Sequence, residues 1–299
     1  MRARTSLLLD KTPAWGLTVV AMLSIQLGSA VSVSLFPEIG TAGTAWLRLS
    51  LGALILILVV RPRVRSITRK NLPGLLGLGA ITGLMTLSFL AAIDRIPLGT
   101  AVAIEFLGPL TVAALSGKNK KAAVWPLVAL VGVVLMTEPW TTNVDPVGVG
   151  FAALAGVFWG LYIILTQQVG DQFTGVQGLA LSTPIAAITA GIVGVPQAIG
   201  NITWQVLALG LLLGLLTPAL PFALEMLALK RMNKRAFGTL MAVEPAIASL
   251  IGVVILLQVP GLLDVFGIAL VILAGVATQR DADRPPLLDI PATPETSSE

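Results

Sequence analysis

Two stretches of this chain have nearly the same sequence: Gly99-Thr100-Ala101-Val102-Ala103-Ile104-Glu105 and Gly238-Thr239-Leu240-Met241-Ala242-Val243-Glu244. Each places a carboxylate inside an apolar run, where an ionisable group is costly and therefore usually functional. Upstream of them, residues 92–96 (AIDRI) resemble residues 228–232 (ALKRM). The chain therefore looks duplicated, with one buried acid in each copy. Many secondary transporters are built in this way, with binding groups at matched positions near the membrane midplane.

The composition is that of a membrane protein with many spans. Of the 299 residues, 56% are hydrophobic and only 11% are charged, which excludes an ordinary soluble domain. A helix needs about 20 apolar residues to cross a membrane. The sequence predicts ten such runs, at 14–34, 41–60, 72–93, 97–116, 122–138, 147–167, 174–195, 204–229, 236–257 and 262–278. We therefore expect an all-α membrane protein with ten transmembrane helices.

Cysteine and histidine are both absent from the sequence. This excludes disulfides, thiolate chemistry, imidazole metal sites and a histidine proton relay. The net charge of +4 does not indicate a nucleic-acid partner, because the cations fall in loops that flank the membrane. We expect no cofactor and no bound metal.

The distribution of the cations predicts the orientation. In a ten-span count, nearly all Lys and Arg residues fall on one side of the membrane, and Arg95 alone lies in an opposite loop. By the positive-inside rule, both termini are cytoplasmic. The cations on the cytoplasmic side are Arg2, Arg4, Lys11, Arg61, Arg63, Arg65, Arg69, Lys70, Lys118, Lys120, Lys121, Lys230, Arg231, Lys234, Arg235, Arg280 and Arg284.

The duplication and the span count together predict an inverted repeat. Each half holds five spans, so the second copy enters the membrane with the opposite orientation. We expect the first five-helix repeat at residues 1–140 and the second, inverted repeat at 141–278. Residues 279–299 are rich in Pro, Asp, Ser and Glu, and we expect a disordered cytoplasmic tail there.

Four charged residues fall well inside predicted spans: Arg48, Glu105, Glu225 and Glu244. Arg48 and Glu105 lie at similar depth, so they can be read as a structural ion pair or as two binding groups. Glu225 is either an interfacial residue near the cations that follow its span or a second proton-exchanging group. Glu244 has no cation at its depth, which makes it the best candidate for a proton-coupling group.

Prolines near the acids predict broken helices. Pro245 follows Glu244 and disfavours helical geometry there, and Pro109 frees the carbonyl of Glu105 from the helix ladder. Such backbone is tolerated at membrane depth where it faces protein or a wet cavity. Further breaks are expected at Thr217-Pro218, Pro221 and Thr183-Pro184.

The remaining main candidates for the cavity wall are Gln26, Trp159 and Tyr162, although Gln26 and Tyr162 can also be read as helix–helix hydrogen-bonding groups. Further polar candidates are Ser24 in span 1 and Thr82, Thr86 and Ser88 in span 3. The G-x-x-x-G pairs that begin at Gly79, Gly156 and Gly210 are better explained as close-packing faces than as sites. Spans 5 and 10 have almost no interior polar residues. We therefore expect them at the periphery, with the cavity lined by spans 1–4 and 6–9.

Several of these motifs occur together in one known family. They are Ser24-Ile25-Gln26, Leu47-Arg48-Leu49, Pro97-Leu98-Gly99, Glu105-Phe106 with Gly108-Pro109, Ala219-Leu220-Pro221 with Leu224-Glu225-Met226, and Phe237-Gly238-Thr239-Leu240-Met241 with Glu244-Pro245-Ala246. Over residues 14–278 the chain resembles the EamA-type drug/metabolite transporter superfamily, and in particular its inner-membrane threonine/homoserine exporters. The resemblance implies two five-helix halves around a central cavity. It also implies export of small amino acids across the plasma membrane in exchange for protons.

Under this hypothesis, Arg48 binds the carboxylate of an amino acid through its bidentate fork, Glu105 accepts the ammonium, and Glu244 exchanges the proton. The expected partners are a small-molecule substrate, protons and the lipid bilayer, and a homodimer stays an open alternative. An exporter of drugs or other metabolites is the second interpretation. We do not expect an enzyme or an ATP-driven pump, because the sequence has no midplane aspartate pair and no G-x-x-x-x-G-K motif. Kinked helices with several midplane acids suit a carrier better than a channel.

Overall fold

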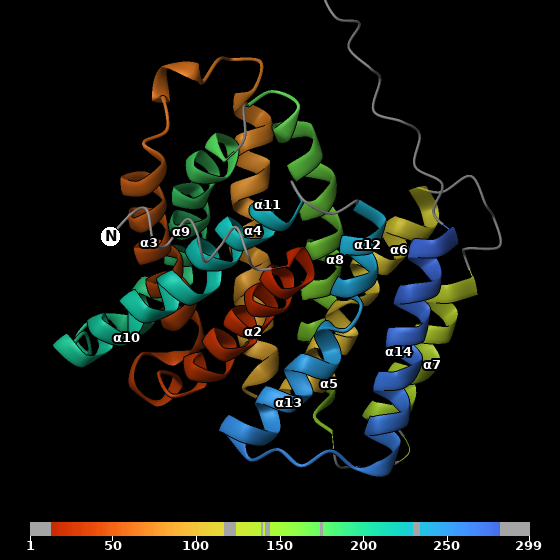
Figure 1. Ribbon diagram of the computed structural model, residues 1–299. Coiled ribbons are helices and arrows are strands. Elements are labelled where there is room, and N and C mark those ends of the chain that lie inside the picture. The colour runs from red at the N-terminus through yellow and green to blue at the C-terminus, as the bar shows by residue number, and fades with distance from the viewer. Residues whose placement is uncertain are drawn as a thin grey trace, which may run out of the picture.

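The protein was analysed as a computed structural model (Figure 1), which describes residues 13–116, 124–138, 140, 144–173, 176–229 and 234–281. The described part of the chain is helical and contains no β-strand. Its α-helices are α2 (Ala14–Val33), α3 (Phe36–Val60), α4 (Leu72–Ile93), α5 (Leu98–Glu105), α6 (Leu107–Ser116), α7 (Val124–Thr137), α8 (Pro146–Gly170), α9 (Gln177–Ala198), α10 (Trp204–Gly214), α11 (Leu220–Leu229), α12 (Lys234–Met241), α13 (Glu244–Leu256) and α14 (Leu262–Asp281). Two short helical segments are η1 (Val64–Ser66) and the π-helical η3 (Leu215–Ala219).

Helices occupy all ten of the apolar runs found in the sequence. Within the described part of the chain, seven helical segments are long and apolar enough to cross a membrane, and three further runs form shorter apolar helices at Val124–Thr137, Trp204–Ala219 and Leu262–Thr278. The ten-span count and the inverted repeat therefore stay predictions. The expected disordered tail, 279–299, begins with residues 279–281 inside α14, and its remainder lies outside the described residues.

Three of the runs are broken where proline chemistry predicts it. Run 97–116 divides into α5 and α6 at Phe106, three residues before Pro109. Run 236–257 divides into α12 and α13 at residues 242–243, directly before Glu244. Pro245 therefore lies in the first turn of α13, where a backbone N–H would have no partner within the helix. Run 204–229 widens into η3 around Pro218. The carbonyl of Leu216 in η3 accepts a 2.7 Å hydrogen bond from Ser24 Oγ of α2.

The break expected at Thr183-Pro184 was wrong. Helix α9 continues through Pro184 from Gln177 to Ala198. The Thr183 hydroxyl donates a 2.7 Å hydrogen bond to the carbonyl of Leu179, one turn back in the same helix. Neighbouring helices and Ser or Thr hydroxyls let membrane helices tolerate a proline in this way.

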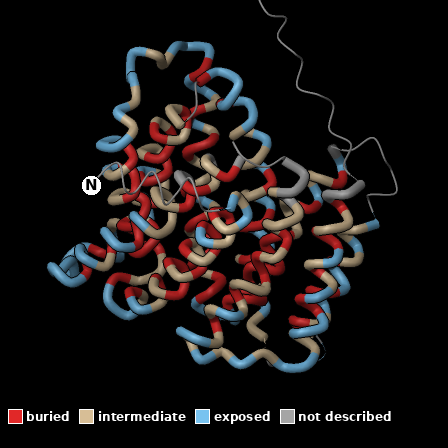
Figure 2. Tube along the Cα trace, viewed as in Figure 1, coloured by how far each residue is buried: buried red, intermediate tan, exposed pale blue. Residues whose placement is uncertain are grey.

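The surface of the bundle is apolar, as expected for a protein embedded in lipid. Large side chains such as Ile192, Leu58 and Val254 are more than half exposed, and similar residues occur on the outer faces of most helices. Figure 2 shows the buried positions concentrated along the inner faces of the helices. A soluble protein rarely exposes apolar patches of this extent, so the chain is an integral membrane protein.

Helices from the two halves of the chain pack tightly at small residues. A Cβ at Gly79 of α4 would lie 2.6 Å from the Ser182 carbonyl of α9, and a Cβ at Gly214 would lie 2.7 Å from the backbone nitrogen of Gly52 in α3. A Cβ at Gly108 would overlap the carbonyl oxygen of Gly156. These approaches confirm that the G-x-x-x-G pairs are packing faces. Helices α7 and α14 pack against each other at one edge of the bundle (Figure 1).

Glutamine side chains from the second half cap two helices of the first half at one end of the bundle. Helix α3 is non-helical at Gly40, with φ 70°, and Gln197 Oε1 of α9 accepts hydrogen bonds from the backbone of Ala42 (3.1 Å) and Gly43 (3.4 Å). Gln258 Oε1 accepts in the same way from the backbone of Leu98 (3.0 Å) at the start of α5. Both contacts satisfy donors that a broken or starting helix leaves free.

An exposed ion pair lies at this same end. Arg95, in the turn between α4 and α5, donates a 3.0 Å hydrogen bond to Asp145 Oδ2, and Asp145 Oδ1 caps α8 by accepting from the backbone of Val147 at 2.8 Å. The hydrogen bond from Arg95 lowers the pKa of Asp145 below its ordinary value.

Candidate functional site

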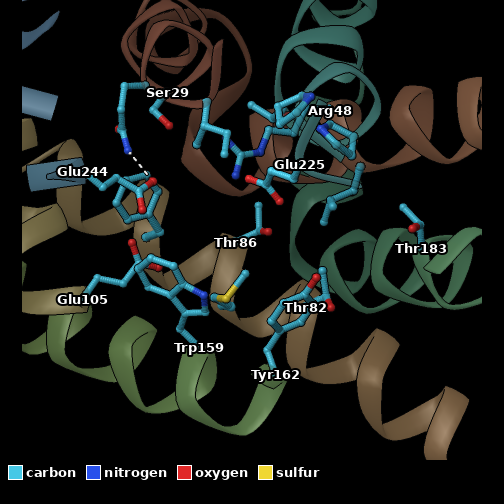
Figure 3. A pocket seen from close by; sticks show the side chains of 18 of the residues that line it. Ser29, Arg48, Thr82, Thr86, Glu105, Trp159, Tyr162, Thr183, Glu225 and Glu244 are labelled. Atoms are coloured by element: carbon cyan, nitrogen blue, oxygen red, sulfur yellow. Dashed lines mark hydrogen bonds between the residues drawn. The ribbon is translucent and has the colours of Figure 1, made fainter. Parts of the chain in front are cut away.

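A cavity of about 290 Å³ lies among the helices that correspond to spans 1–4 and 6–9 (Figure 3). This volume is near the lower end of the range for small-molecule sites, about 300–1,000 Å³. None of the described residues of α7 or α14 lines it, as the sequence predicted for spans 5 and 10. The lining residues are Ile25, Gln26, Ser29, Arg48, Leu49, Thr82, Met85, Thr86, Phe89, Glu105, Trp159, Tyr162, Leu179, Thr183, Thr217, Pro218, Pro221, Glu225, Met241 and Glu244.

The seven main candidates from the sequence lie on the wall of this one cavity. They come from six different helices: Gln26 from α2, Arg48 from α3, Glu105 from α5, Trp159 and Tyr162 from α8, Glu225 from α11 and Glu244 from α13. The structure thus brings together groups that are up to 218 positions apart in the chain, the separation of Gln26 and Glu244. What each group does there stays a prediction.

Gln26 and Glu244 form a direct contact inside the bundle. Gln26 Nε2 donates a 3.0 Å hydrogen bond to Glu244 Oε1, drawn as a dashed line in Figure 3. Only 2% of Gln26 and 3% of Glu244 is exposed. The single oxygen of Gln26, Oε1, and the second oxygen of Glu244, Oε2, have no hydrogen-bond partner among the described residues. Buried acceptors without a donor are uncommon and call for a ligand, a proton or water.

Glu105 stands at the break between α5 and α6. It is the last residue of α5, and Phe106 after it packs edge-on against Trp159 of α8, with ring centroids 6.1 Å apart. Behind this junction, a Cβ at Gly156 would lie 2.8 Å from the carbonyl oxygen of Glu105. The glycine therefore lets α8 approach closely enough for Trp159 and Glu105 to share one region of the cavity wall (Figure 3).

Arg48 is a buried cation without a close acid. It is 9% exposed, its Nη1 atom has no hydrogen-bond partner among the described residues, and no described carboxylate oxygen lies within 4.0 Å of its guanidinium. The structure therefore does not support the interpretation of Arg48 and Glu105 as a direct structural ion pair. It places both on the same cavity wall, which suits two groups that bind opposite ends of a zwitterion.

Glu225 also faces the cavity, from α11 beyond the π-helical segment. This position favours its interpretation as a cavity group. The alternative, an interfacial residue near Lys230 and Arg231, involves cations that lie outside the described residues.

Sequence reasoning missed part of the wall. It named Thr82 and Thr86 of α4, which line the cavity, but not Met85 and Phe89, which extend the same stripe at helical spacing. It also missed Ser29 of α2, which lies one turn after Gln26. That spacing was the available signal, because residues three, four and seven apart share a helix face. Ser24 and Ser88 were also considered from the sequence, but neither lines the cavity.

The described part of the chain holds no cluster of three acidic, His or Cys groups that could bind a metal ion. What the cavity does offer is one cation, three acids, an amide and several hydroxyls within an apolar and aromatic lining. Such a wall suits a small molecule that carries both charges.

Comparison with known proteins identifies the family. The model of the EamA-like transporter family matches residues 146–278. The chain is 41% identical over 256 residues to the threonine/homoserine exporter RhtA of Escherichia coli K12, covering 83% of this chain and 86% of that protein. The chain belongs to the EamA-like transporter family.

Other similarities agree with this membership. The Salmonella typhimurium LT2 exporter of the same name is 37% identical over 284 residues, which cover 92% of this chain and 95% of the relative. A protein described as an uncharacterized transporter in Helicobacter pylori is 28% identical over 148 residues, covering 47% of this chain and 49% of that protein. A solved crystal structure with a TM-score of 0.60 and 18% identity, covering 90% of this chain and 98% of its own, shares the fold. The chain is therefore a membrane transporter and not an enzyme.

Proposed function

We propose that this transporter exports small neutral or hydroxylated amino acids, such as threonine and homoserine, across the plasma membrane in exchange for protons. The observation that carries the proposal is one cavity wall holding a buried guanidinium and three carboxyl groups, in a chain 41% identical to a protein named threonine/homoserine exporter. A cavity of about 290 Å³ accommodates an amino acid together with a few waters.

The two charged ends of an amino acid match the two kinds of charged group. Arg48 binds the carboxylate, because its planar fork fits that group and its Nη1 has no partner among the described residues. Glu105 attracts the ammonium from the α5 side, and Glu244 exchanges the proton, with Glu225 as a second proton-exchanging group. Thr82 and Thr86 of α4 supply hydroxyls for the polar part of the substrate side chain.

Alternating access supplies the transport step. In this proposal the chain forms ten spans in two inverted five-helix repeats, 1–140 and 141–278, with both termini in the cytoplasm. Exchanging the conformations of the two repeats would open the cavity to each side of the membrane in turn. The broken helices at Phe106 and at residues 242–243 give the wall flexible points next to Glu105 and Glu244.

Efflux from living cells tests the proposal. Cells that express the chain are preloaded with radiolabelled threonine or homoserine, and efflux is followed with and without a protonophore. We expect efflux above that of the empty-vector control, and we expect the protonophore to reduce it. Efflux equal to the control would overturn the amino-acid assignment, and the remaining interpretation would be an exporter of drugs or other metabolites. Resistance profiling against dyes and amino-acid analogues would then identify the substrate class.

A further inference from the structure

The amide of Gln26 has two different ends, and the structure uses only one of them. Its Nε2 arm donates to Glu244 Oε1 at 3.0 Å, while its Oε1 arm has no donor among the described residues. Both side chains are at least 97% buried and both line the cavity. A role for this pair in how an amino acid and a proton exclude each other in the cavity rests on the proposed function.

The chemistry of the amide makes its orientation depend on the protonation of Glu244. An ionised carboxylate only accepts hydrogen bonds, so it selects the amide orientation in which Nε2 faces it. A protonated carboxyl also carries one O–H donor, which the carbonyl end of the amide can accept. Half a turn about the last side-chain bond of Gln26 exchanges the two orientations. If the amide follows the proton in this way, the free arm presents an acceptor when Glu244 is ionised and a donor when Glu244 is protonated.

We propose that the Gln26 amide couples the protonation of Glu244 to the binding of the substrate's ammonium group. With Glu244 ionised, the free Oε1 accepts a hydrogen bond from the ammonium. With Glu244 protonated, the amide N–H groups take the position of Oε1. The N–H groups of the amide and of the ammonium, which are both donors, would then face each other, and the ammonium is disfavoured. As the ammonium binds, the Glu244 proton leaves to water in the cavity, and Gln26 itself never carries it. Gln26 is thus a positioning residue that acts through its neighbour.

Other titratable groups surround the pair and define the competing explanation. Glu105 faces the cavity from α5, Arg48 from α3, Glu225 from α11 and Tyr162 from α8. If the ammonium displaced the proton by contacting a carboxylate directly, the competition would not require Gln26. The behaviour of Gln26 variants therefore separates the amide coupling from direct competition.

The experiment measures proton release together with threonine binding. Purified full-length protein in weakly buffered detergent solution is titrated with radiolabelled threonine across the neutral pH range, and a pH-sensitive dye records the protons released. Wild type is expected to release about one proton per threonine on the acidic side of the titration. Its apparent affinity there is expected to fall about tenfold per pH unit, because only the competent fraction binds.

Three variants complete the test. Gln26→Leu removes both arms of the amide, and we expect weaker threonine binding with almost no proton release and no pH dependence. The exchange variant Gln26→Glu/Glu244→Gln keeps one acid and one amide in contact, and we expect proton release to return. Ser32→Ala is the matched control, because Ser32 is a buried polar residue of α2 that bonds only the Gly28 carbonyl of its own helix and does not line the cavity. It should release protons as wild type does.

Each outcome is decisive. Equal proton release per bound threonine in Gln26→Leu and wild type would overturn the amide coupling and leave the proposed function standing. If Gln26→Leu does not fold, an exchange variant that binds threonine without releasing a proton would overturn the coupling instead. Binding of threonine by wild type without any proton release would overturn both the coupling and the antiport. Absence of threonine and homoserine binding in wild type would overturn the proposed function itself.

Discussion

Arg48→Met separates a binding arginine from a structural one. Arg48 is 9% exposed, and no described carboxylate lies within 4.0 Å of it, so its desolvation is not offset by a close ion pair. Removing one partner of a true buried ion pair costs about 3–5 kcal/mol because the other charge is left buried and uncompensated. Removing an unpaired buried ion leaves no such charge and ends that ion's own desolvation cost. We therefore expect the free energy of unfolding of Arg48→Met to stay within about 1 kcal/mol of wild type.

Substrate binding should change much more than stability. A hydrogen bond to a charged group contributes about 1.5–3 kcal/mol, and leaving the substrate carboxylate without this partner should weaken binding by about 10- to 140-fold. Arg48→Lys keeps the charge but loses the planar fork, so we expect an intermediate loss. Arg95→Met is the matched control, because Arg95 is 43% exposed and pairs with Asp145 at the surface, where an ion pair contributes less than about 1 kcal/mol.

The assay combines threonine efflux from preloaded cells, normalised to the amount of protein in the membrane, with thermal unfolding of the purified variants followed by tryptophan fluorescence. Arg48→Met should unfold near the wild-type temperature and export little threonine. A lower unfolding temperature that corresponds to a loss of about 3 kcal/mol or more would refute this reasoning. It would support the interpretation of Arg48 as part of a structural ion pair. Export at the wild-type rate would refute the assignment of Arg48 to the substrate carboxylate.

Three further predictions concern the scaffold. Gly40→Ala should lower the unfolding temperature, because Gly40 has φ 70° and a Cβ there would overlap Gln197 Oε1. Gly170→Ala is the control and should leave the unfolding temperature unchanged, because no atom lies within 4 Å of its added Cβ. Equal unfolding temperatures for the two variants would count against the Gln197 cap. Gly108→Val should lower the free energy of unfolding by about 1–3 kcal/mol or more, because a Cβ at this position would overlap the Gly156 carbonyl. It should also reduce export by displacing Glu105. Gly150→Val is the control and should leave export intact, because no atom lies within 4 Å of its added Cβ. Because the hydrogen bond from Arg95 lowers the pKa of Asp145, the stabilisation from this pair should be present above about pH 4 and lost as pH falls through the lowered pKa. The free energy of unfolding of Asp145→Asn should therefore be slightly below that of wild type at neutral pH, and this difference should shrink as the pH falls. A difference that grows in acid would contradict the prediction.

A physical argument from the sequence places the candidate residues in the interior of the bundle. A charged or polar residue in the middle of an apolar run has to face the interior of a bundle, so Arg48, Glu105 and Glu244 could be assigned to a cavity without a structure. The sequence left Gln26 open between the cavity wall and a helix–helix hydrogen bond, and in the structure it both lines the cavity and bonds Glu244 of another helix. Depth along a span is also readable from sequence: it put Arg48 and Glu105 at a similar level, and both line the same cavity.

The rotation of each helix about its own axis is not readable in the same way. Depth alone allowed Arg48 to pair with Glu105, and the structure keeps the two beyond 4.0 Å. The caps by Gln197 and Gln258 were missed because their acceptors lie 155 and 160 positions from the donors. The false break at Pro184 came from treating every proline as an interruption, although a helix supported by its neighbours can continue through one.

Efflux from proteoliposomes under an imposed pH gradient tests the central claim most directly. Purified protein is reconstituted with threonine inside, and efflux is measured with and without an imposed pH gradient, acidic outside, for wild type and Glu244→Gln. If the cavity exchanges protons for amino acids through Glu244, the gradient should accelerate threonine efflux in wild type and have no effect in Glu244→Gln. Acceleration of equal size in Glu244→Gln would contradict the role of Glu244, and wild-type efflux that ignores the gradient would contradict proton antiport.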